Sequence, residues 1–440
     1  MTAEAEVVDL VSTLIRFDTS NTGDPATTRG EAECAHWVAA QLQAVGYETE
    51  YIEAGAPGRG NVFCRLKGAD PARGALLIHG HLDVVPAEPA DWSVHPFSGA
   101  VKDGYVWGRG AVDMKNMVGM MIAVARQLRR DGIVPPRDLV FAFVSDEEHG
   151  GTYGCQWLVD NRPDLFAGVT EAVGEVGGFS LTVPTTDGGE KRLYLIETAE
   201  KGLAWMRLTA RGRAGHGSMV HDDNAVTRIA EAVARLGRHQ FPIVLTDPVR
   251  DFLAAVGEEM GVAFDVDSPD LDGQIAKLGG IARIIGATLR DTANPTMLNA
   301  GYKANVIPAT AEAVLDCRVL PGRQQAFERE VDELIGPDVT RSWERNLPSV
   351  HTTFDGALVD AMNAAILAAD PQARTVPYML SGGTDAKAFV RLGIRCFGFA
   401  PLRLPPELDF AALFHGVDER VPVEALQFGT RVLHHFLTHC

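Results

Sequence analysis

The stretches ALLIHGHLD (residues 75–83) and LVFAFVSDEE (residues 139–148) each join an apolar run to polar side chains at its C-terminal end. A helical pattern over residues 115–130 separates them. Strands that alternate with helices predict a mostly parallel sheet with helices on both faces. Ligands of such sheets bind in the crevice at the carboxyl edge of the strands, where several loops meet. We therefore expect the two polar clusters to contribute to one candidate site.

The alternation of helices and strands continues on both sides of these stretches. Helices are predicted over residues 4–15, 30–45 and 355–369, near Gly151, and from Val423 onward. Strands are predicted over residues 47–52, 61–66 and 394–400. We therefore expect an α/β domain, a mostly parallel mixed sheet flanked by helices, formed by residues 1–198 and 348–440.

The sequence between these two segments has a different pattern. GLAWMRLTARGRAGHGS (residues 202–218) and residues 311–319 alternate as exposed strands do, and helical patterns follow each of them. Two strand–helix pairs of this kind predict a smaller α+β domain inserted at residues 199–347. Residues 241–295 mix helical patterns with turn clusters, and we assign them no function.

Composition limits the kinds of partner and the compartment. With 40 Lys and Arg against 58 Asp and Glu, the 440-residue chain carries a formal charge of −18, which repels nucleic acid and anionic membranes. It has no apolar run near the roughly 20 residues of a membrane span and no secretory signal at its start. Its six cysteines form no CxxC pair, which fits reduced thiols. We expect a cytoplasmic protein with neither a nucleic-acid nor a membrane partner.

His81 and Asp83 form the first candidate ligand group. Residues two apart in a strand point the same way, so Asp83 can accept the N–H that a metal-bound His81 donates. Asp113 follows in WGRGAVDMK, just before a predicted helix, where it can equally act as an N-cap. Taken alone, either motif is also compatible with a structural role.

Three more acids and one more histidine occupy comparable positions. Glu147 and Glu148 follow a buried strand, where adjacent carboxylates are costly unless cations or a catalytic task compensate. Glu175 ends a short apolar stretch in GEVGG, and His415 precedes the last helix in FHGVDE. Two histidines and several acids on separate strand ends are a suitable ligand mix for two divalent ions about 3.5–4 Å apart.

A series of motifs resembles the M20 family of metallopeptidases, which includes aminoacylases, carboxypeptidase G-type enzymes, succinyl-diaminopimelate desuccinylases and carnosinase-like dipeptidases. The motifs, in chain order, are HLDVVP, GRGAVDMK, SDEEHGG, GEVGG, AGHGS, NVIP, DCRVLPG, SGGTDA and FHGVDE. The resemblance covers most of the chain and is weakest over residues 241–295. It implies a zinc-dependent hydrolase that cleaves the amide bond of small peptides or N-acyl amino acids. The inserted domain would then be a lid and a dimerisation surface.

The resemblance also implies roles for the candidate residues. Two divalent ions, Zn²⁺ with Co²⁺ or Mn²⁺ as alternatives, would be held by His81 and Glu175, by Glu148 and His415, and by Asp113 as the bridge. Asp83 would orient the first histidine. Glu147 would stay unligated and act as the general base that moves a proton from water to the leaving nitrogen. The peptide bond between Asp113 and Met114 is predicted to be cis.

A further group resembles the family's carboxylate-binding elements: Asn305, Arg318, Ser381, Gly382, Gly383 and Thr384. Arginine grips a carboxylate with two parallel hydrogen bonds, and glycines let backbone N–H groups approach it. Without the resemblance, the arginine would be a surface charge and SGGT a turn. His216 in AGHGS would reach into a partner's cleft and stabilise the developing oxyanion, which requires a homodimer.

Three alternatives to this reading remain. The motifs do not separate substrates within the family, so a succinyl-diaminopimelate desuccinylase is the nearest alternative. From another class, a catalytically inactive metal-binding scaffold is an alternative, although retention of Glu147 and of every ligand position argues against it. A two-metal phosphoesterase uses similar carboxylate-rich sites, but the motif set as a whole disfavours it.

Overall fold

The predicted parallel strands form the centre of a ten-stranded mixed sheet in the computed structural model, which describes residues 2–265, 268, 270–278 and 280–440. The central strands are parallel and lie in the order β6 (Leu139–Val144), β3 (Ala75–His81), β7 (Val169–Gly174) and β18 (Arg395–Gly398). The outer strands are β1 (Thr49–Glu53) and β2 (Gly60–Leu66) beyond β6, and β8 (Ser180–Pro184), β9 (Glu190–Glu200), β16 (Val350–His351) and β17 (Arg374–Leu380) beyond β18. The α/β prediction is confirmed.

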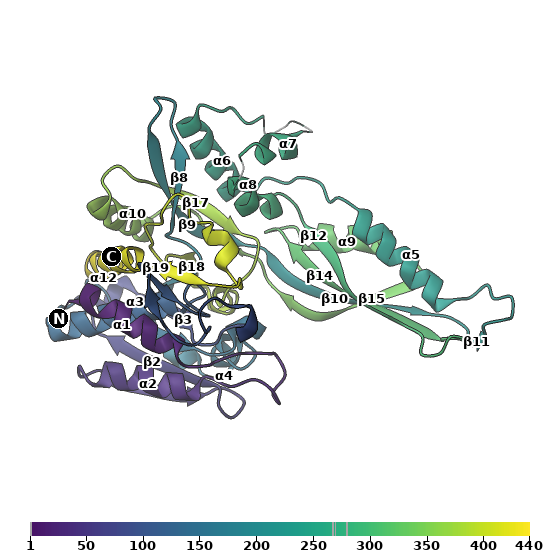
Figure 1. The fold of residues 1–440 in the computed structure, drawn as a ribbon, viewed down its shortest axis with the longest axis horizontal. Helices are drawn as coiled ribbons and strands as arrows, with labels where there is room; N and C mark the ends of the chain where they lie inside the picture. The colour runs from purple at the N-terminus through teal and green to yellow at the C-terminus, as the bar shows by residue number, and fades with distance from the viewer. Residues whose placement is uncertain (1, 266–267, 269, 279) are drawn as a thin grey trace.

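Both faces of this sheet are buried, so its central strands read as continuous apolar runs. In β3, Leu76 and Ile78 belong to the core on one face, whereas Leu77 belongs to the core on the other. The first face is covered by α1 (Ala3–Ile15), α2 (Ala32–Gln43), α3 (Lys115–Arg130), α10 (Ala357–Ala369) and α12 (Val423–His439) (Figure 1). The second face is covered by α4 (Cys155–Asn161) and α11 (Ala386–Phe389).

The predicted helices and strands agree with the structure to within a few residues at most ends. The helix expected near Gly151 begins later, at Cys155, because a 3₁₀ turn at Glu147–His149 and two glycines with positive φ precede it. In the described part of the chain, no helix combines the length and the apolar character needed to cross a bilayer.

The inserted region forms an arm that projects from the large sheet (Figure 1). Its antiparallel four-stranded sheet has the order β12 (Thr292–Ala300), β14 (Thr310–Val319), β10 (Gly202–Arg211) and β15 (Val339–Leu347) among the described residues. Helices α5 (Ala225–Arg238) and α9 (Gln324–Ile335) bury Ile229 and Phe327 against Met206 and Leu315 of this sheet. Strands covered by helices on one face give the α+β architecture that the sequence predicts.

Part of residues 241–295, the segment without an assigned function, packs against the large sheet and not against the sheet of the arm. Helix α6 (Asp247–Met260) presents Val249, Phe252, Leu253 and Val256 at helical spacing, and these residues join the core of the large sheet. The short helices α7 (Leu271–Ala276) and α8 (Gly280–Ile285) follow it. The segment therefore lies within the expected inserted range of 199–347 but shares the core of the larger domain. Residues 266, 267, 269 and 279 of this segment lie outside the described residues.

Candidate metal centre

Three of the polar clusters identified in the sequence lie at the ends of adjacent parallel strands. His81 is the last residue of β3, Glu147 opens the 3₁₀ turn after β6, and Glu175 follows β7 directly. Because these strands are hydrogen-bonded to one another and run parallel, their carboxyl ends meet at one edge of the sheet. The fold thus collects side chains that are far apart in the sequence.

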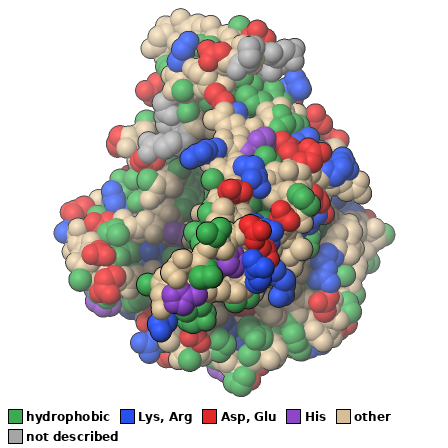
Figure 2. Space-filling view, turned by 90° about the vertical axis from the view of Figure 1, so that its right-hand side faces the viewer, with side chains coloured by type: hydrophobic (Ala, Val, Ile, Leu, Met, Phe, Trp, Pro, Cys, Tyr) green, Lys and Arg blue, Asp and Glu red, His purple; other side chains and the backbone are tan. Residues whose placement is uncertain are grey.

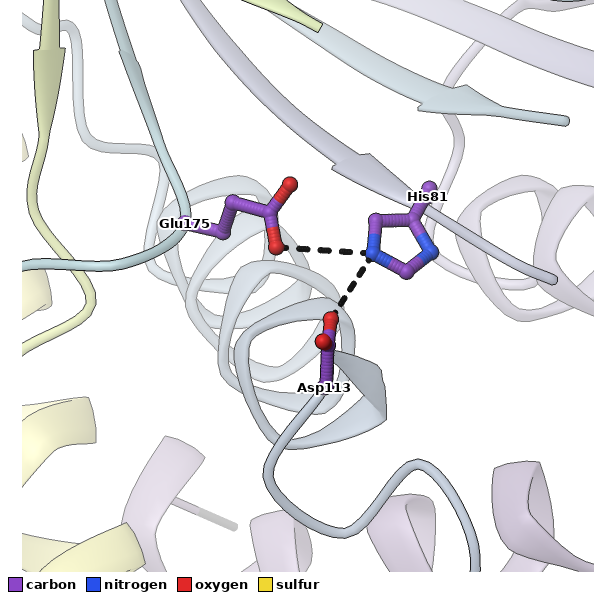
Figure 3. A group of neighbouring side chains, drawn as sticks. All are labelled: His81, Asp113 and Glu175. Carbon is purple, nitrogen blue, oxygen red and sulfur yellow. Dashed lines mark hydrogen bonds and ion pairs between the residues drawn. The ribbon is translucent and has the colours of Figure 1, made fainter. Parts of the chain in front are cut away.

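The first set of possible ligand atoms comes from His81, Asp113 and Glu175 (Figure 3). Nε2 of His81 lies 3.1 Å from Oδ1 of Asp113 and 3.4 Å from Oε2 of Glu175. Asp113 reaches this position from the loop just before α3. All three ligand atoms lie within 4.8 Å of one another, which is the spacing at which one cation can contact all of them.

The second set consists of Asp113, Glu148 and His415, again within 4.8 Å. Nε2 of His415 lies 3.2 Å from Oδ2 of Asp113 and 3.1 Å from Oε2 of Glu148. Asp113 therefore offers one oxygen to each set. This shared carboxylate is the arrangement expected of a residue that bridges two cations.

The residues of the two sets fit divalent cations. Oε1 of Glu148 is buried and has no hydrogen-bond partner among the described residues. Burial raises the pKa of Glu175 to about 8, and burial together with the Asp113 charge raises the pKa of Glu148. A bound cation compensates the desolvation of such carboxylates, and mixed imidazole and carboxylate ligands suit zinc and similar ions.

Asp83, two residues beyond the end of β3, lies behind His81, but its closest contact with the imidazole is made by its main-chain carbonyl and not by its carboxylate. Nδ1 of His81 is 3.0 Å from the main-chain carbonyl of Asp83 and 3.4 Å from its carboxylate Oδ1. Both acceptors favour an N–H on Nδ1, which leaves Nε2 free to face Asp113 and Glu175.

Glu419 organises the loop that carries Asp113. Its Oε1 accepts the N–H groups of Val112 and Asp113 over 2.6 and 3.0 Å, and its Oε2 accepts Nη1 of Arg109 over 2.7 Å. The peptide bond between Asp113 and Met114 is cis, as predicted. The sequence reasoning missed Glu419, although its place in the motif FHGVDE could have drawn attention to it.

A cavity of about 460 Å³ opens beside the two sets of ligand atoms. Its lining includes the charged or metal-ligating residues Asp113, Glu147, Glu148, Glu175 and His415. Its apolar and aromatic lining consists of Val176, Phe179, Leu203, Trp205, Ile284, Leu347, Tyr378, Leu380, Ala411 and Phe414. The cavity thus combines charged groups with apolar surface that can accept an apolar substituent.

The predicted carboxylate-binding residues Arg318, Ser381, Gly382, Gly383 and Thr384 also line this cavity. Arg318, on β14 of the arm, pairs with Asp316 through Nε–Oδ1 and Nη2–Oδ2 contacts of 2.7 and 3.1 Å. The N–H and hydroxyl groups of Thr384 both donate to the buried Glu200. A Cβ on Gly383 would lie 2.2 Å from Cε of Lys387, so only glycine fits there without a shift.

Two predicted site residues, His216 and Asn305, lie away from both ligand sets and from the cavity of their own chain. His216 lies in β11 (Gly215–His216), which pairs with β13 (Val306–Ile307), next to Asn305. Figure 1 shows β11 at the far end of the arm. Neither residue can therefore act on this cavity without another copy or a large movement of the arm.

Other cavity residues received no role in the sequence analysis. Asp385 is buried at the cavity, and burial raises its pKa to about 7. Arg345 lines the cavity and donates to the carbonyl of His149. Asp385 belongs to the quoted motif SGGTDA, which was a usable signal. Arg345 belongs to a polar, alternating strand of the arm, and only the fold turns it toward the cavity.

The chain is similar in sequence to known proteins over most of its length. The sequence model described as Peptidase family M20/M25/M40 matches residues 77–439. The chain is 30% identical over 366 residues to the Probable carboxypeptidase S-like 2 of Dictyostelium discoideum. The aligned region covers 81% of this chain and 70% of that protein. It is also 30% identical over 379 residues to the N-fatty-acyl-amino acid synthase/hydrolase PM20D1 of Homo sapiens, covering 82% and 73% respectively.

Among solved structures, the M20 family metallo-carboxypeptidase Sso-CP2 from Sulfolobus solfataricus has a similar fold. Its TM-score is 0.71 at 18% identity, with 98% of each chain covered. At this identity the similarity concerns the fold alone, including the arm attached to a larger α/β domain.

Proposed function

Because this chain belongs to peptidase family M20/M25/M40 and is a hydrolase of peptide or amide C–N bonds, we propose that it is a dinuclear zinc enzyme for N-acyl amino acids or small peptides. The observation that carries the proposal is the pair of ligand sets that share Asp113. His81 and Glu175 complete the site of one ion, and Glu148 and His415 that of the other. When bound, two such cations lower the pKa of a water molecule and polarise a carbonyl group.

Glu147 is the general base in this proposal. It lies next to the proposed ligand Glu148 and lines the cavity, but it belongs to neither ligand set. Burial and the charge of Glu175 raise the pKa of Glu147 well above its usual value, which suits a group that accepts and then returns a proton. The carboxylate would take a proton from the attacking water and pass it to the leaving nitrogen.

The polar and the apolar residues of the cavity lining support a substrate that has a carboxylate and an apolar acyl or side chain. Arg318 and the backbone N–H groups of residues 381–383 offer donors for a carboxylate. Phe179, Tyr378 and Ile284 belong to the apolar lining, and the name of the human relative includes N-fatty-acyl-amino acids. The six cysteines are all free thiols, which supports the cytoplasm as the location.

A homodimer would complete the site with His216 from a second copy. The outer strand β12 pairs only with β14 among the described residues, so one of its backbone edges is open. Met219, Val220, Met297, Leu298 and Tyr302 are exposed side chains of the arm. Figure 2, which faces the arm's end of the molecule, shows apolar groups among acidic and basic ones. An open strand edge with exposed apolar side chains supports pairing with a second copy.

A substrate panel tests the proposal. Zinc-loaded protein should hydrolyse N-acyl amino acids or dipeptides and leave phosphate monoesters intact. Preferential hydrolysis of N-succinyl-diaminopimelate would select the desuccinylase alternative. Zinc binding without hydrolysis of any amide would select the inactive scaffold.

Zinc is expected to stabilise the chelator-treated protein more strongly at pH 8 than at pH 6. Hydrogen bonds to Asp113 and Glu148 raise the pKa of His415 to about 10, and burial raises that of Glu175 to about 8, so both groups hold protons at pH 6. Zinc must displace these protons, and its affinity therefore rises with pH. A ligand at 100 times its Kd contributes about 2.7 kcal/mol. Calorimetric melting with and without zinc measures this difference, and an equal or smaller shift at pH 8 would contradict it.

Replacing Arg318 with Leu is expected to raise KM for substrates with a free carboxylate. A hydrogen bond to a charged group is worth about 1.5–3 kcal/mol, which corresponds to roughly a tenfold to hundredfold change. Steady-state kinetics with an N-acyl amino acid and with its carboxamide measures the effect. The carboxamide is the control, since its KM should change much less. Equal losses for both substrates would show that Arg318 supports the fold of the arm and does not bind the carboxylate.

A further inference from the structure

The N-terminal residues 19–21 run alongside residues 82–84, the segment that continues from β3. Ser20 forms a parallel bridge with Val84, and the N–H of Asn21 donates to the Val84 carbonyl over 2.9 Å. This pairing places the Asn21 side chain, which is 4% exposed, outside the cavity lining and close to the metal centre.

The side-chain amide of Asn21 joins two buried carboxylates. Its Nδ2 donates to Oδ2 of Asp83 and to Oδ1 of Asp146, each over 2.9 Å. Its Oδ1 accepts the N–H of Gly23 over 3.1 Å and Nη2 of Arg59 over 3.4 Å. Since carboxylates only accept and arginine only donates, these partners determine which way the amide faces.

Both carboxylates support the turn that carries Glu147 and Glu148. Asp83 accepts the N–H of Glu147 on Oδ1 and that of Glu148 on Oδ2, each over 3.1 Å. Asp146 precedes the turn in a left-handed conformation with φ of 66°, which is uncommon for a residue with a side chain. Its Oδ2 accepts the N–H of Tyr153 over 2.8 Å. The turn thus depends on where Asp83 and Asp146 are held.

Asn21 also separates two charges that burial makes costly. Asp83 and Asp146 are both fully buried. Asp146 has a cationic partner in Arg59, whose Nη2 lies 3.2 Å from Oδ1, while the same guanidinium pairs with Glu31 over 2.7 Å. Without the amide between them, the two carboxylates would face each other with fewer donors and would repel.

We infer that Asn21 is a positioning residue of the metal centre, which ties the carboxylate behind His81 to the turn that carries Glu147 and Glu148. The inference rests on the proposed dinuclear site. Through Asp83, Asn21 fixes the spacing between His81, a proposed ligand of one ion, and Glu148, a proposed ligand of the other. Asn21 itself contacts neither ligand. Loss of groups that orient metal ligands typically lowers metal affinity or activity by 10–100-fold.

The test compares the zinc affinity of the intact chain with that of Asn21→Leu and Asn21→Asp, by competition with a chromophoric chelator. Leu keeps the approximate volume without polar atoms, and Asp keeps the shape but donates no hydrogen bond. Thr19→Val is the matched control, because the Thr19 hydroxyl donates to the Leu82 carbonyl over 2.7 Å and anchors the same segment without touching either carboxylate. Melting temperature and circular dichroism report the fold of each variant.

We expect both Asn21 variants to bind zinc 10–100-fold more weakly, while Thr19→Val loses thermal stability but keeps its zinc affinity. Unchanged affinity in the Asn21 variants, or an equal loss in Thr19→Val, would overturn the inference. If neither Asn21 variant folds while Thr19→Val does, Asn21→Ser, which keeps one donor, takes their place. Failure of that variant to fold would also overturn the positioning role. Absence of zinc binding by the unmodified chain would instead refute the proposed function.

Discussion

Glu147→Gln is expected to lower kcat by about 10²–10⁴-fold while both metal ions stay bound, because proton transfer is the only function removed. Glutamine has the same shape, and Glu147 belongs to neither set of ligand atoms. The backbone N–H of residue 147 still donates to Asp83 in this variant, so the turn should hold. Steady-state kinetics with an N-acyl amino acid, together with metal content by atomic emission, measures both quantities.

Glu148→Gln is the matched control for this prediction. It changes the neighbouring residue by the same chemical group, but Glu148 belongs to the second ligand set, where its Oε2 lies 3.1 Å from Nε2 of His415. Its buried Oε1 has no hydrogen-bond partner among the described residues. This variant should bind metal more weakly, and its activity should recover partly when the zinc concentration is raised. Metal loss in the Glu147 variant combined with full metal content in the Glu148 variant would show that the two roles are exchanged.

The large domain was predictable because local signals and the fold agree. The apolar runs that end at His81 and Val144 are buried on both faces, and helices cover both faces as alternation predicts. Residues at the carboxyl ends of such strands meet by necessity. For this reason the sequence alone assigns the polar clusters to one site.

The surroundings of the site were less predictable, because they depend on long-range contacts. Glu419 reaches back to the loop before α3, and Asn21 reaches two carboxylates from a segment near the N-terminus. A single Glu or Asn in a loop carries no periodicity that distinguishes it from a solvated residue. The packing of helix α6 was equally hard to predict. Its apolar residues indicate that one face is buried, but not whether that face packs on the large sheet or on the arm.

His216→Ala is expected to lower kcat roughly 10²–10³-fold. This loss corresponds to the stabilisation of the transition state by one oxyanion donor, about 2.7–4 kcal/mol. The local geometry suits this role. The N–H of Ser218 donates to Nδ1 of His216 over 3.2 Å, so the neutral ring carries its proton on Nε2, which can donate to an oxyanion. The side chain is exposed at the end of the arm and is absent from the cavity lining of its own chain. Any catalytic contribution should therefore reach the cavity of a second copy.

Subunit complementation tests this expectation directly. A His216→Ala chain keeps Glu147 but has no histidine to donate, whereas a Glu147→Gln chain can donate His216 but lacks its own base. In a heterodimer, one site combines the intact Glu147 of the first chain with the His216 of the second, while the other site lacks both groups. Mixing the two inactive proteins under conditions that exchange subunits should therefore restore activity, and each protein incubated alone is the control.

If exchange is verified by mass-tagged chains and activity stays absent, His216 acts within its own chain or has no part in catalysis. The arm would then have to bend over its own cavity, or the oxyanion would have to be stabilised by another cavity donor, such as Arg345.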